Sequence, residues 1–216
     1  MTSSNIKIVI IDDSIGNIGS LMNAFGRLDR GVEVSKTSVI DEIENADAIV
    51  LSGVGAFQAA TDSLRAKNLD QVLRKVVIDQ RKPFLGICLG MQMLLEGSQE
   101  YGWHEGLSFL DGRVQELSHD HTHRLPHVGW NSIQITNSDS RLLRGLDEHD
   151  SFYFDHSFAY TDTANSVSAA TCRYGSTFTA VIEQGNTMGV QFHPEISGSS
   201  GHILLNNFLD IASAAA

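Results

Sequence analysis

PFLGICLGMQ, residues 83–92, decides how this chain folds around its most reactive side chain. Residues 83–87 have the length and apolarity of a buried strand, and apolar side chains recur at helical spacing from Gly90 onward. Between them, Gly86 and Gly90 flank Cys88, the pattern of a nucleophile elbow between a strand and a helix. Such a tight turn has no room for a side chain on either side of the nucleophile. We therefore expect Cys88 to project over a helix N-terminus, where backbone N–H groups favour a negatively charged sulfur.

A small buried core residue is the alternative interpretation of Cys88. Ordinary strand-to-helix turns do not require glycine at both flanking positions, so the elbow is the interpretation that we carry forward.

Strand and helix patterns alternate through the first 98 residues. Short apolar runs predict strands at 6–11, 32–35, 48–51 and 83–88, and helical patterns cover 18–28, 41–45 and 57–81, the last interrupted near Lys67-Asn68. This alternation is typical of a doubly wound, mostly parallel sheet with right-handed crossovers, an α/β fold.

The second half of the chain has a different pattern. Short β-type segments follow one another at 112–117, 128–135, 151–160, 167–171, 178–183 and 187–192, with hairpin turns at 174–176 and 184–186. They predict an antiparallel extension of the parallel core, closed by an amphipathic helix at 201–209. We find no linker or repeat, and predict a single domain over residues 1–216.

Composition narrows the classes of function. The 216 residues carry a net charge of −11 without a Lys/Arg cluster, which disfavours nucleic-acid or anionic-membrane binding. No apolar run is long enough to span a membrane, and the polar N-terminus lacks a signal-peptide pattern. With only two cysteines, Cys88 and Cys172, we expect a cytoplasmic, reduced protein, which suits a working thiol.

A base for the thiol is found in His193-Pro194-Glu195. A cysteine nucleophile needs a group that takes and later delivers a proton, and that base needs a partner that orients it. Pro194 disfavours the helical conformation for His193. In an extended segment His193 and Glu195 would face the same side, so the carboxylate could fix the imidazole tautomer.

The tetrahedral intermediate of such chemistry needs hydrogen-bond donors for its oxyanion. The backbone N–H of Leu89 follows the nucleophile directly. The glycine-rich loop Gly53-Val54-Gly55 ends the neighbouring predicted strand and can present a second donor.

These and other motifs resemble one family over nearly the whole chain. The motifs are GICLGMQ, GVGAF, LPHVGWN, FYFDHSFAY and GVQFHPEISGSSGHILLNNF. They resemble the class I (triad) glutamine amidotransferases, which have a flavodoxin-like fold, and within them the glutaminase subunits of imidazole glycerol phosphate synthase. The resemblance implies a catalytic triad of Cys88, His193 and Glu195, an oxyanion hole of Gly53, Val54, Gly55 and Leu89, and glutamine binding by Gln92, Glu100 and Ser157.

The resemblance also implies the substrate and the partner. The substrate would be L-glutamine, hydrolysed through a γ-glutamyl thioester without a cofactor. Free ammonia is mostly protonated at neutral pH, so a docked synthase subunit that receives it through a channel is implied. In the family this partner is a (β/α)8-barrel cyclase of histidine biosynthesis, and residues 126–131 and 152–160 would lie near the interface.

The chain departs from the family pattern at Asp13, Ser52, Asp155, Phe158 and Ile196. None of these positions supplies a triad atom. Some lie on the expected partner face, so a glutaminase subunit that feeds a sugar amidotransferase is an alternative. A cysteine hydrolase of γ-glutamyl peptides and a degenerate regulatory subunit are two further alternatives.

A metal site is one more hypothesis to test. His119, His121 and His123 alternate, with His127 close by, and on a strand alternating histidines would share a face as zinc ligands do. The segment 118–124 has no flanking apolar pattern, so we interpret it as a polar surface loop and assign no metal.

Overall fold

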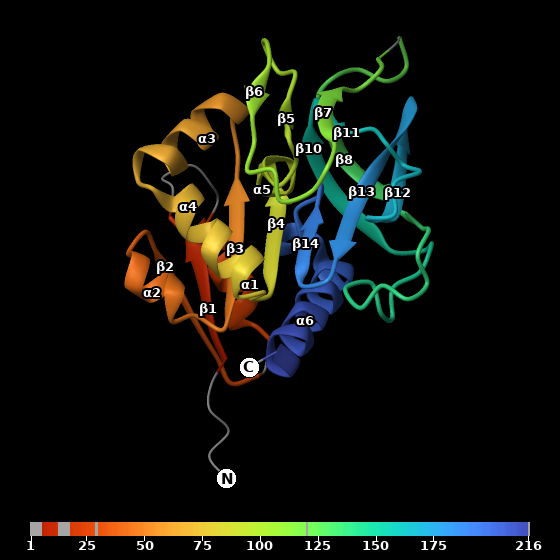
Figure 1. Ribbon diagram of the computed structural model, residues 1–216. Coiled ribbons are helices and arrows are strands. Elements are labelled where there is room, and N and C mark those ends of the chain that lie inside the picture. Colours follow the sequence, from red (N-terminus) through yellow and green to blue (C-terminus); the bar gives the residue numbers. More distant parts are fainter. Residues whose placement is uncertain (1–5, 13–17, 29, 120, 216) are drawn as a thin grey trace.

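The structure is a computed structural model that describes residues 6–12, 18–28, 30–119 and 121–215 (Figure 1). Asp13 and most of the turn expected after the first strand lie outside the described residues. In the described part, the predicted α/β architecture is confirmed, with the sheet in the middle and helices on both of its faces.

A central sheet of eight strands organises the fold. Its order is β2 (Val32–Thr37), β1 (Ile6–Ile11), β3 (Ala48–Gly53), β4 (Phe84–Cys88), β14 (Thr187–Val190), β13 (Ser176–Gln184), β12 (Ser168–Tyr174) and β9 (Gln134–Ile135). The strands from β2 to β14 are parallel, and β13, β12 and β9 continue the sheet in antiparallel pairing. The sequence therefore predicted both halves of this sheet correctly.

Helices cover the two faces of the sheet because its strands are apolar on both sides. Their bounds are α1 (Ile18–Gly26), α2 (Ile40–Glu44), α3 (Phe57–Ala66), α4 (Leu69–Leu73), a π-helical turn (Arg74–Asp79), α5 (Leu89–Met93), a 3₁₀ turn (Pro194–Ile196) and α6 (Gly198–Ala215). Helices α1 and α6 pack in one apolar cluster, whereas α2 to α5 pack in the cluster on the opposite face. The predicted interruption at Lys67-Asn68 is confirmed, since Asn68 has a φ of 56° between α3 and α4.

Two smaller sheets correct the prediction for the second half. One pairs β8 (His127–Ser132) with β10 (Ser151–His156), and the other has the order β11 (Phe158–Tyr160), β7 (Arg113–Glu116), β5 (Gly97–Ser98) and β6 (His104–Glu105).

The predicted continuous strand 151–160 is therefore wrong, because it is interrupted at Ser157. Phe154 packs in the cluster of α1 and α6, whereas Tyr160 packs in the opposite cluster, so the chain must change sheets between them. The predicted segment 128–135 is likewise divided at Ile133, because β8 pairs with β10 and β9 joins the central sheet.

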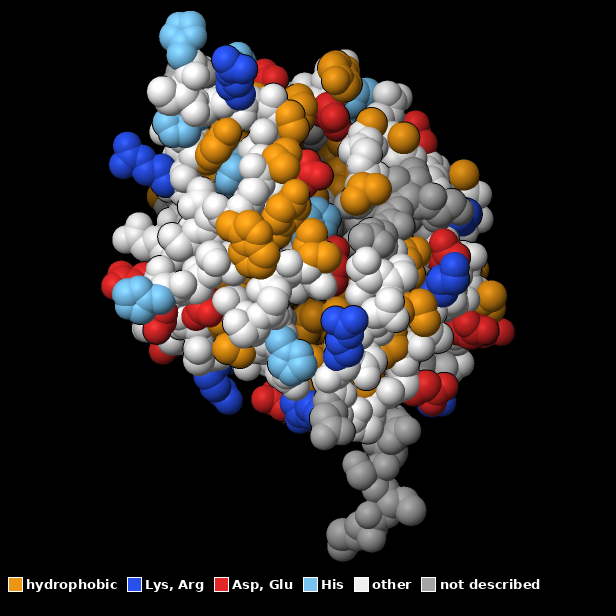
Figure 2. Space-filling view, turned by 180° about the vertical axis from the view of Figure 1, so that it is seen from behind, with side chains coloured by type: hydrophobic (Ala, Val, Ile, Leu, Met, Phe, Trp, Pro, Cys, Tyr) orange, Lys and Arg blue, Asp and Glu red, His pale blue; other side chains and the backbone are white. Residues whose placement is uncertain are grey.

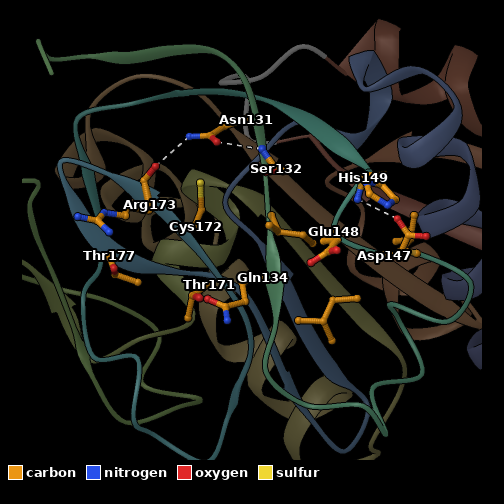
Figure 3. A pocket seen from close by; sticks show the side chains of 13 residues that line it. Asn131, Ser132, Gln134, Asp147, Glu148, His149, Thr171, Cys172, Arg173 and Thr177 are labelled. Atoms are coloured by element: carbon orange, nitrogen blue, oxygen red, sulfur yellow. Dashed lines mark hydrogen bonds between the residues drawn. The ribbon is translucent and has the colours of Figure 1, made fainter. Parts of the chain in front are cut away.

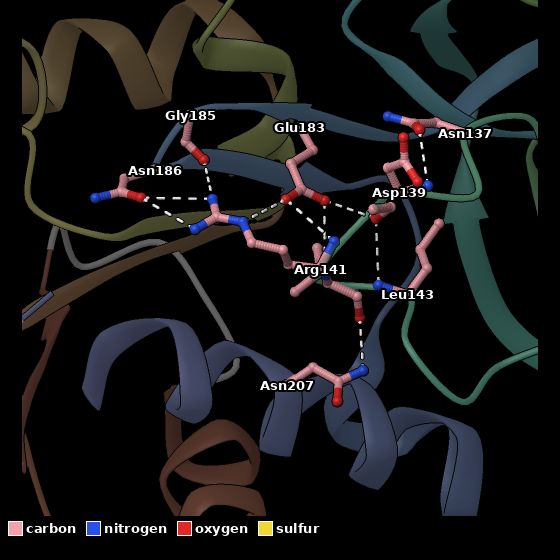
Figure 4. Close-up of polar contacts among 10 residues, drawn as sticks. Asn137, Asp139, Arg141, Leu143, Glu183, Gly185, Asn186 and Asn207 are labelled. Carbon is pink, nitrogen blue, oxygen red and sulfur yellow. Dashed lines mark hydrogen bonds and ion pairs between the residues drawn. The ribbon is translucent and has the colours of Figure 1, made fainter. Parts of the chain in front are cut away.

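A network of hydrogen bonds holds the loop between β9 and β10 in place (Figure 4). The Glu183 carboxylate accepts hydrogen bonds from the Ser140 hydroxyl at 2.6 Å and from Arg141 Nε at 3.2 Å. The Arg141 guanidinium also donates to the Gly185 carbonyl in the β13–β14 turn. Asn207 of α6 donates to the carbonyl of Leu142 at 2.9 Å. The loop is thus tied to β13, to the β13–β14 turn and to α6.

Candidate active site

Cys88 lies at the junction predicted from the glycine spacing, at the end of β4 and directly before α5. Its φ of 53° and ψ of −110° form a backbone conformation that L residues rarely adopt, as expected of a nucleophile elbow. A Cβ on Gly86 would lie 2.7 Å from the Gly90 carbonyl oxygen, and a Cβ on Gly90 would overlap the Leu51 carbonyl. Both glycines are therefore required by close backbone contacts.

His193 follows β14, which pairs with β4 in parallel, so the fold brings it to the end of the sheet where Cys88 lies. Its Nδ1 is 2.9 Å from Glu195 Oε1, and the side chain of Glu195 is only 1% exposed. The predicted pairing is present, but its stated reason is wrong. Residues 194–196 form a 3₁₀ turn rather than an extended segment, and this turn folds the carboxylate back onto the imidazole.

Hydrogen bonds hold the backbone of His193 from both sides. The His193 N–H donates to the carbonyl of Tyr153 at 2.8 Å, and the Ser197 hydroxyl donates to the His193 carbonyl at 2.6 Å. Ser197 also accepts from the Tyr153 N–H. The position of His193 therefore depends on β10 as well as on its own segment.

The charge of His193 is set by its neighbours. Burial alone would lower the pKa of His193, but hydrogen bonds to Cys88 and Glu195, together with their charges, outweigh burial and raise the pKa to about 10. The imidazole is consequently protonated at neutral pH, between a sulfur and a carboxylate. This arrangement can hold a proton and deliver it to a leaving group.

The loop predicted to form the oxyanion hole lies beside the nucleophile. Gly53 pairs in register with Cys88 across β3 and β4, and a Cβ on Gly53 would lie 3.3 Å from the Leu89 Cβ. Val54 is exposed, and Gly55 has a φ of 95°, which favours glycine. The loop is close enough to take part, and the roles of Gly53, Val54, Gly55 and Leu89 stay predictions.

The three predicted glutamine-binding residues lie in different settings. Gln92 is buried in α5, and its Nε2 donates to the Phe158 carbonyl at 2.7 Å and to Gln191 Oε1 at 3.1 Å. Glu100 Oε2 accepts from the Phe57 N–H at 2.7 Å, at the N-terminus of α3, where a carboxylate is favoured. Ser157 lies between β10 and β11, half-buried. Substrate binding by these residues stays a prediction.

Three side chains near the site received no positioning role at the level of sequence: Gln191, His156, and His127, which was considered only as a metal ligand. The Gln191 Nε2 donates to Cys88 Sγ at 3.6 Å, and His127 Nδ1 lies 3.2 Å from His156 Nε2. His127 and His156 occupy opposite register positions in the β8–β10 ribbon, 29 residues apart in the chain. Alternation of buried and exposed residues along each strand was the only available signal, and it does not reveal which strands pair.

The four histidines considered as metal ligands lie in two different parts of the structure. His127 is buried in the ribbon, whereas His119, His121 and His123 belong to the loop before it, where His119 and His121 are exposed. In the described ranges, 6–12, 18–28, 30–119 and 121–215, no group of three or more His, Cys, Asp and Glu side chains could hold a metal ion. Within the same ranges, none of the helices has the length and apolarity needed to cross a membrane.

Figure 3 shows a groove whose lining does not include Cys88. It encloses about 1070 Å³ between β8, β9, β12 and the segment 146–149, and its lining includes Asn131 and Cys172. Burial raises the pKa of the Cys172 thiol to about 12. Cys172 is therefore a core residue, and the thiol in the elbow stays the candidate nucleophile.

The fold and the elbow together indicate a class of protein: an α/β protein with a cysteine in a nucleophile elbow and a histidine–glutamate pair beside it, the arrangement of a Cys-His-Glu triad. The family model described as "Glutamine amidotransferase class-I" matches residues 9–212. A crystal structure of a glutamine amidotransferase superposes with a TM-score of 0.73 at 19% identity, covering 95% of this chain and 98% of that one. At this identity the superposition shows the fold alone.

Sequence relatives give a narrower placement. The chain is 40% identical over 208 residues to the imidazole glycerol phosphate synthase subunit HisH of Zymomonas mobilis, covering 94% of this chain and 95% of the relative. It is 44% identical over 207 residues to the HisH subunit of Methanothermobacter thermautotrophicus, covering 96% and 100%. The chain therefore belongs to the class I glutamine amidotransferases and, within them, to the family of these HisH subunits.

Proposed function

We propose that this chain is the glutaminase subunit of an imidazole glycerol phosphate synthase and releases ammonia from L-glutamine for histidine biosynthesis. The observation that carries the proposal is the placement of His193 between the Cys88 sulfur and the Glu195 carboxylate. The chain matches relatives named as this synthase subunit over nearly their whole length, which supports the same function.

The proposed reaction begins with the Cys88 sulfur and the side-chain amide of glutamine. The thiolate attacks the amide carbon, and the oxyanion accepts hydrogen bonds from the Leu89 N–H and the 53–55 loop. Protonated His193 gives its proton to the departing nitrogen, which leaves as ammonia and creates a γ-glutamyl thioester. His193, now neutral, takes a proton from water, whose hydroxide attacks the thioester and releases glutamate and the thiolate. Glu195 keeps the imidazole oriented in both steps.

The remaining predicted residues would hold the amino-acid end of glutamine. We place Glu100 against its ammonium group, and Gln92 and Ser157 beside it. Because Glu100 binds the Phe57 N–H in the structure, this role requires that its second oxygen, or a shifted side chain, meets the ligand.

A docked partner is part of the proposal, because the ammonia must be used before it escapes. Val54, Val128, Trp130 and Ile196 are exposed hydrophobic side chains that belong to the oxyanion loop, the ribbon and the triad segment. Figure 2 shows hydrophobic side chains gathered together on the upper part of one face of the molecule. Such a patch is typical of a protein–protein interface, and we propose a (β/α)8-barrel cyclase subunit as its partner.

The test uses Cys88→Ala in the reconstituted complex with the cyclase subunit. We expect loss of glutamine-dependent synthesis, while synthesis from added ammonium salts continues at the wild-type rate, because the partner's own site is untouched. Loss of both activities would contradict this division of roles. A wild-type chain that binds a sugar amidotransferase, or hydrolyses γ-glutamyl peptides, would favour one of the alternatives instead.

A further inference from the structure

The Cys88 sulfur has two contacts that the triad chemistry does not use. The side-chain amide of Gln191 donates to Sγ at 3.6 Å, and Sγ lies 3.8 Å from the Asp155 carbonyl oxygen of β10. Gln191 is fully buried just beyond the end of β14, and its N–H donates to the Ala180 carbonyl at 2.9 Å. A buried amide donor directed at sulfur favours the thiolate over the thiol.

The orientation of the Gln191 amide is fixed by Gln92. The Gln92 Nε2 group has two hydrogens, and it lies within hydrogen-bond distance of two oxygens, Gln191 Oε1 and the Phe158 carbonyl. Because Gln191 Oε1 accepts from Gln92, its NH₂ group is directed away from Gln92 and toward the sulfur. Turning either amide would place two donors or two acceptors against each other.

The Phe158 carbonyl connects these amides to the histidine pair. It also lies 2.9 Å from His156 Nδ1, and because a carbonyl only accepts, the hydrogen must be on Nδ1. The Nε2 of neutral His156 is then an acceptor, so His127 Nδ1 carries the hydrogen that joins the two rings at 3.2 Å. At the far end, Asn131 Nδ2 lies 3.5 Å from His127 Nε2. The Phe158 carbonyl therefore accepts two hydrogen bonds, one from the histidine pair and one from Gln92.

This arrangement of hydrogen bonds requires both histidines to be neutral. A proton added to His156 Nε2 would face the His127 Nδ1–H, and a proton added to His127 Nε2 would face the Asn131 amide N–H. Burial lowers the pKa of His127 to about 4. Burial, followed by the charge of His127, lowers the pKa of His156 to about 3. In the described part of the chain, the charge of His193 acts on His156, and Cys88 and Glu195 act on His193. The Tyr174 ring stacks on His127, with the ring centroids 4.1 Å apart. At neutral pH the chain of hydrogen bonds is intact.

We propose that Gln191 is a positioning residue for the nucleophile, held toward the Cys88 sulfur by Gln92. Gln92 is itself fixed by the Phe158 carbonyl, which the hydrogen-bonded pair of His127 and His156 holds from the other side. His127 and His156 lie on the inner face of the β8–β10 ribbon, whereas Val128 and Trp130 are exposed on its outer face. The inference deepens the proposed function, on which it rests for the role of the sulfur.

The pH dependence of Cys88 alkylation by iodoacetamide tests this proposal in the full-length chain. Peptide mass spectrometry separates Cys88 from Cys172, whose buried thiol acts as an internal reference. In Gln191→Met the side chain keeps its length but loses the donor, so we expect the alkylation midpoint to rise by about one pH unit. Gln134→Met, the same change at an exposed position of β9, should leave the midpoint unchanged.

A matched pair at His156 tests the chain beyond Gln191. The amide of asparagine can replace Nδ1, and that of glutamine can replace Nε2. His156→Asn keeps the donor to the Phe158 carbonyl, so its midpoint should stay near the wild-type value. His156→Gln loses that donor and should raise the midpoint by about half a unit.

Two results would overturn the proposal: a wild-type midpoint in folded Gln191→Met, or equal midpoints in the two His156 variants. If Gln191→Met does not fold, Gln191→Leu and the His156 pair still decide the question. The readout needs neither glutamine nor a partner. If the variants show the expected midpoints but the wild-type protein never hydrolyses glutamine, the proposed function is contradicted and the positioning role of Gln191 is kept.

Discussion

The two buried histidine sites of this protein lie close together and differ in charge, since His193 is protonated at neutral pH and the pair of His127 and His156 is neutral. His193, His127 and His156 are all at most 6% exposed. The pKa of His193 is raised to about 10, whereas that of His127 is lowered to about 4 and that of His156 to about 3. Burial opposes the charged form in all three cases, so burial cannot explain the difference.

The hydrogen-bond partners of each imidazole explain the difference in pKa. His193 has the Glu195 carboxylate at 2.9 Å and the Cys88 sulfur on its other side. His127 and His156 have each other, and their remaining contacts are neutral groups. A carboxylate makes a buried histidine a proton carrier, whereas a second imidazole leaves it a neutral hydrogen-bond connector.

Glu195→Gln should have the largest effect, because it removes the group that distinguishes the two sites. We expect kcat/KM for glutamine to fall by about 10³-fold, since the imidazole loses its orientation and its charge partner. The pKa of His193 should fall, because burial remains while one favourable charge is lost. Kinetics of the reconstituted complex and NMR titration measure the two effects, with ammonium-dependent synthesis as the control. An unchanged His193 pKa would show that Glu195 does not raise the pKa of this imidazole.

His127→Glu should convert the second site into a copy of the first. His156 would keep its Nδ1 donor to the Phe158 carbonyl and gain a carboxylate at Nε2 in place of the neutral ring. We expect the pKa of His156 to rise from about 3 to above its ordinary value of 6.5. NMR titration of His156 checks this, with His127→Gln as the uncharged control. A His156 pKa that stays near 3 would show that burial alone decides its charge.

Acid should destabilise the protein through the neutral pair. Both folded-state pKa values lie below the unfolded value, so their contribution to stability is complete above pH 6.5. It is lost as the pH falls through the folded values of about 4 and 3. With two such groups, the free energy of unfolding should fall by roughly 5 kcal/mol between pH 6.5 and 4. Denaturation with urea at each pH measures this loss. The double variant His127→Phe, His156→Leu should lack most of it, and an equal loss there would assign the effect to other groups.

Cys88→Ala tests the other partner of His193. It removes the hydrogen bond and charge of the sulfur from His193 and leaves Glu195 in place, so the pKa of His193 should fall. The pKa values of His127 and His156 should change less, because burial dominates both. NMR titration of this variant checks both statements, and a larger shift at the pair than at His193 would contradict them.

Local sequence signals were sufficient for the first site. Gly86 and Gly90 around Cys88 predicted the elbow because the turn leaves no space for side chains, and the structure shows both close contacts. His193 and Glu195 are two residues apart, so their pairing needs no knowledge of the fold. Even there, the 3₁₀ turn at Pro194 was not predicted, because the pattern of the segment favoured an extended chain.

The second site could not be predicted in the same way. His127 and His156 meet only because β8 pairs with β10, and the sequence placed their segments in longer strands that the structure divides at Ile133 and Ser157. The contacts of Gln191 with Cys88 and of Gln92 with the Phe158 carbonyl join elements more than 60 residues apart. Such contacts depend on strand order and register, which alternation within one strand does not specify.

Imidazole ¹⁵N NMR at pH 7 tests the central claim most directly, with each signal assigned by single histidine substitutions. The account predicts that His193 is protonated on both nitrogens, while His127 and His156 are each protonated on Nδ1 alone. A neutral His193, or a charged or Nε2-protonated ring at His127 or His156, would contradict it.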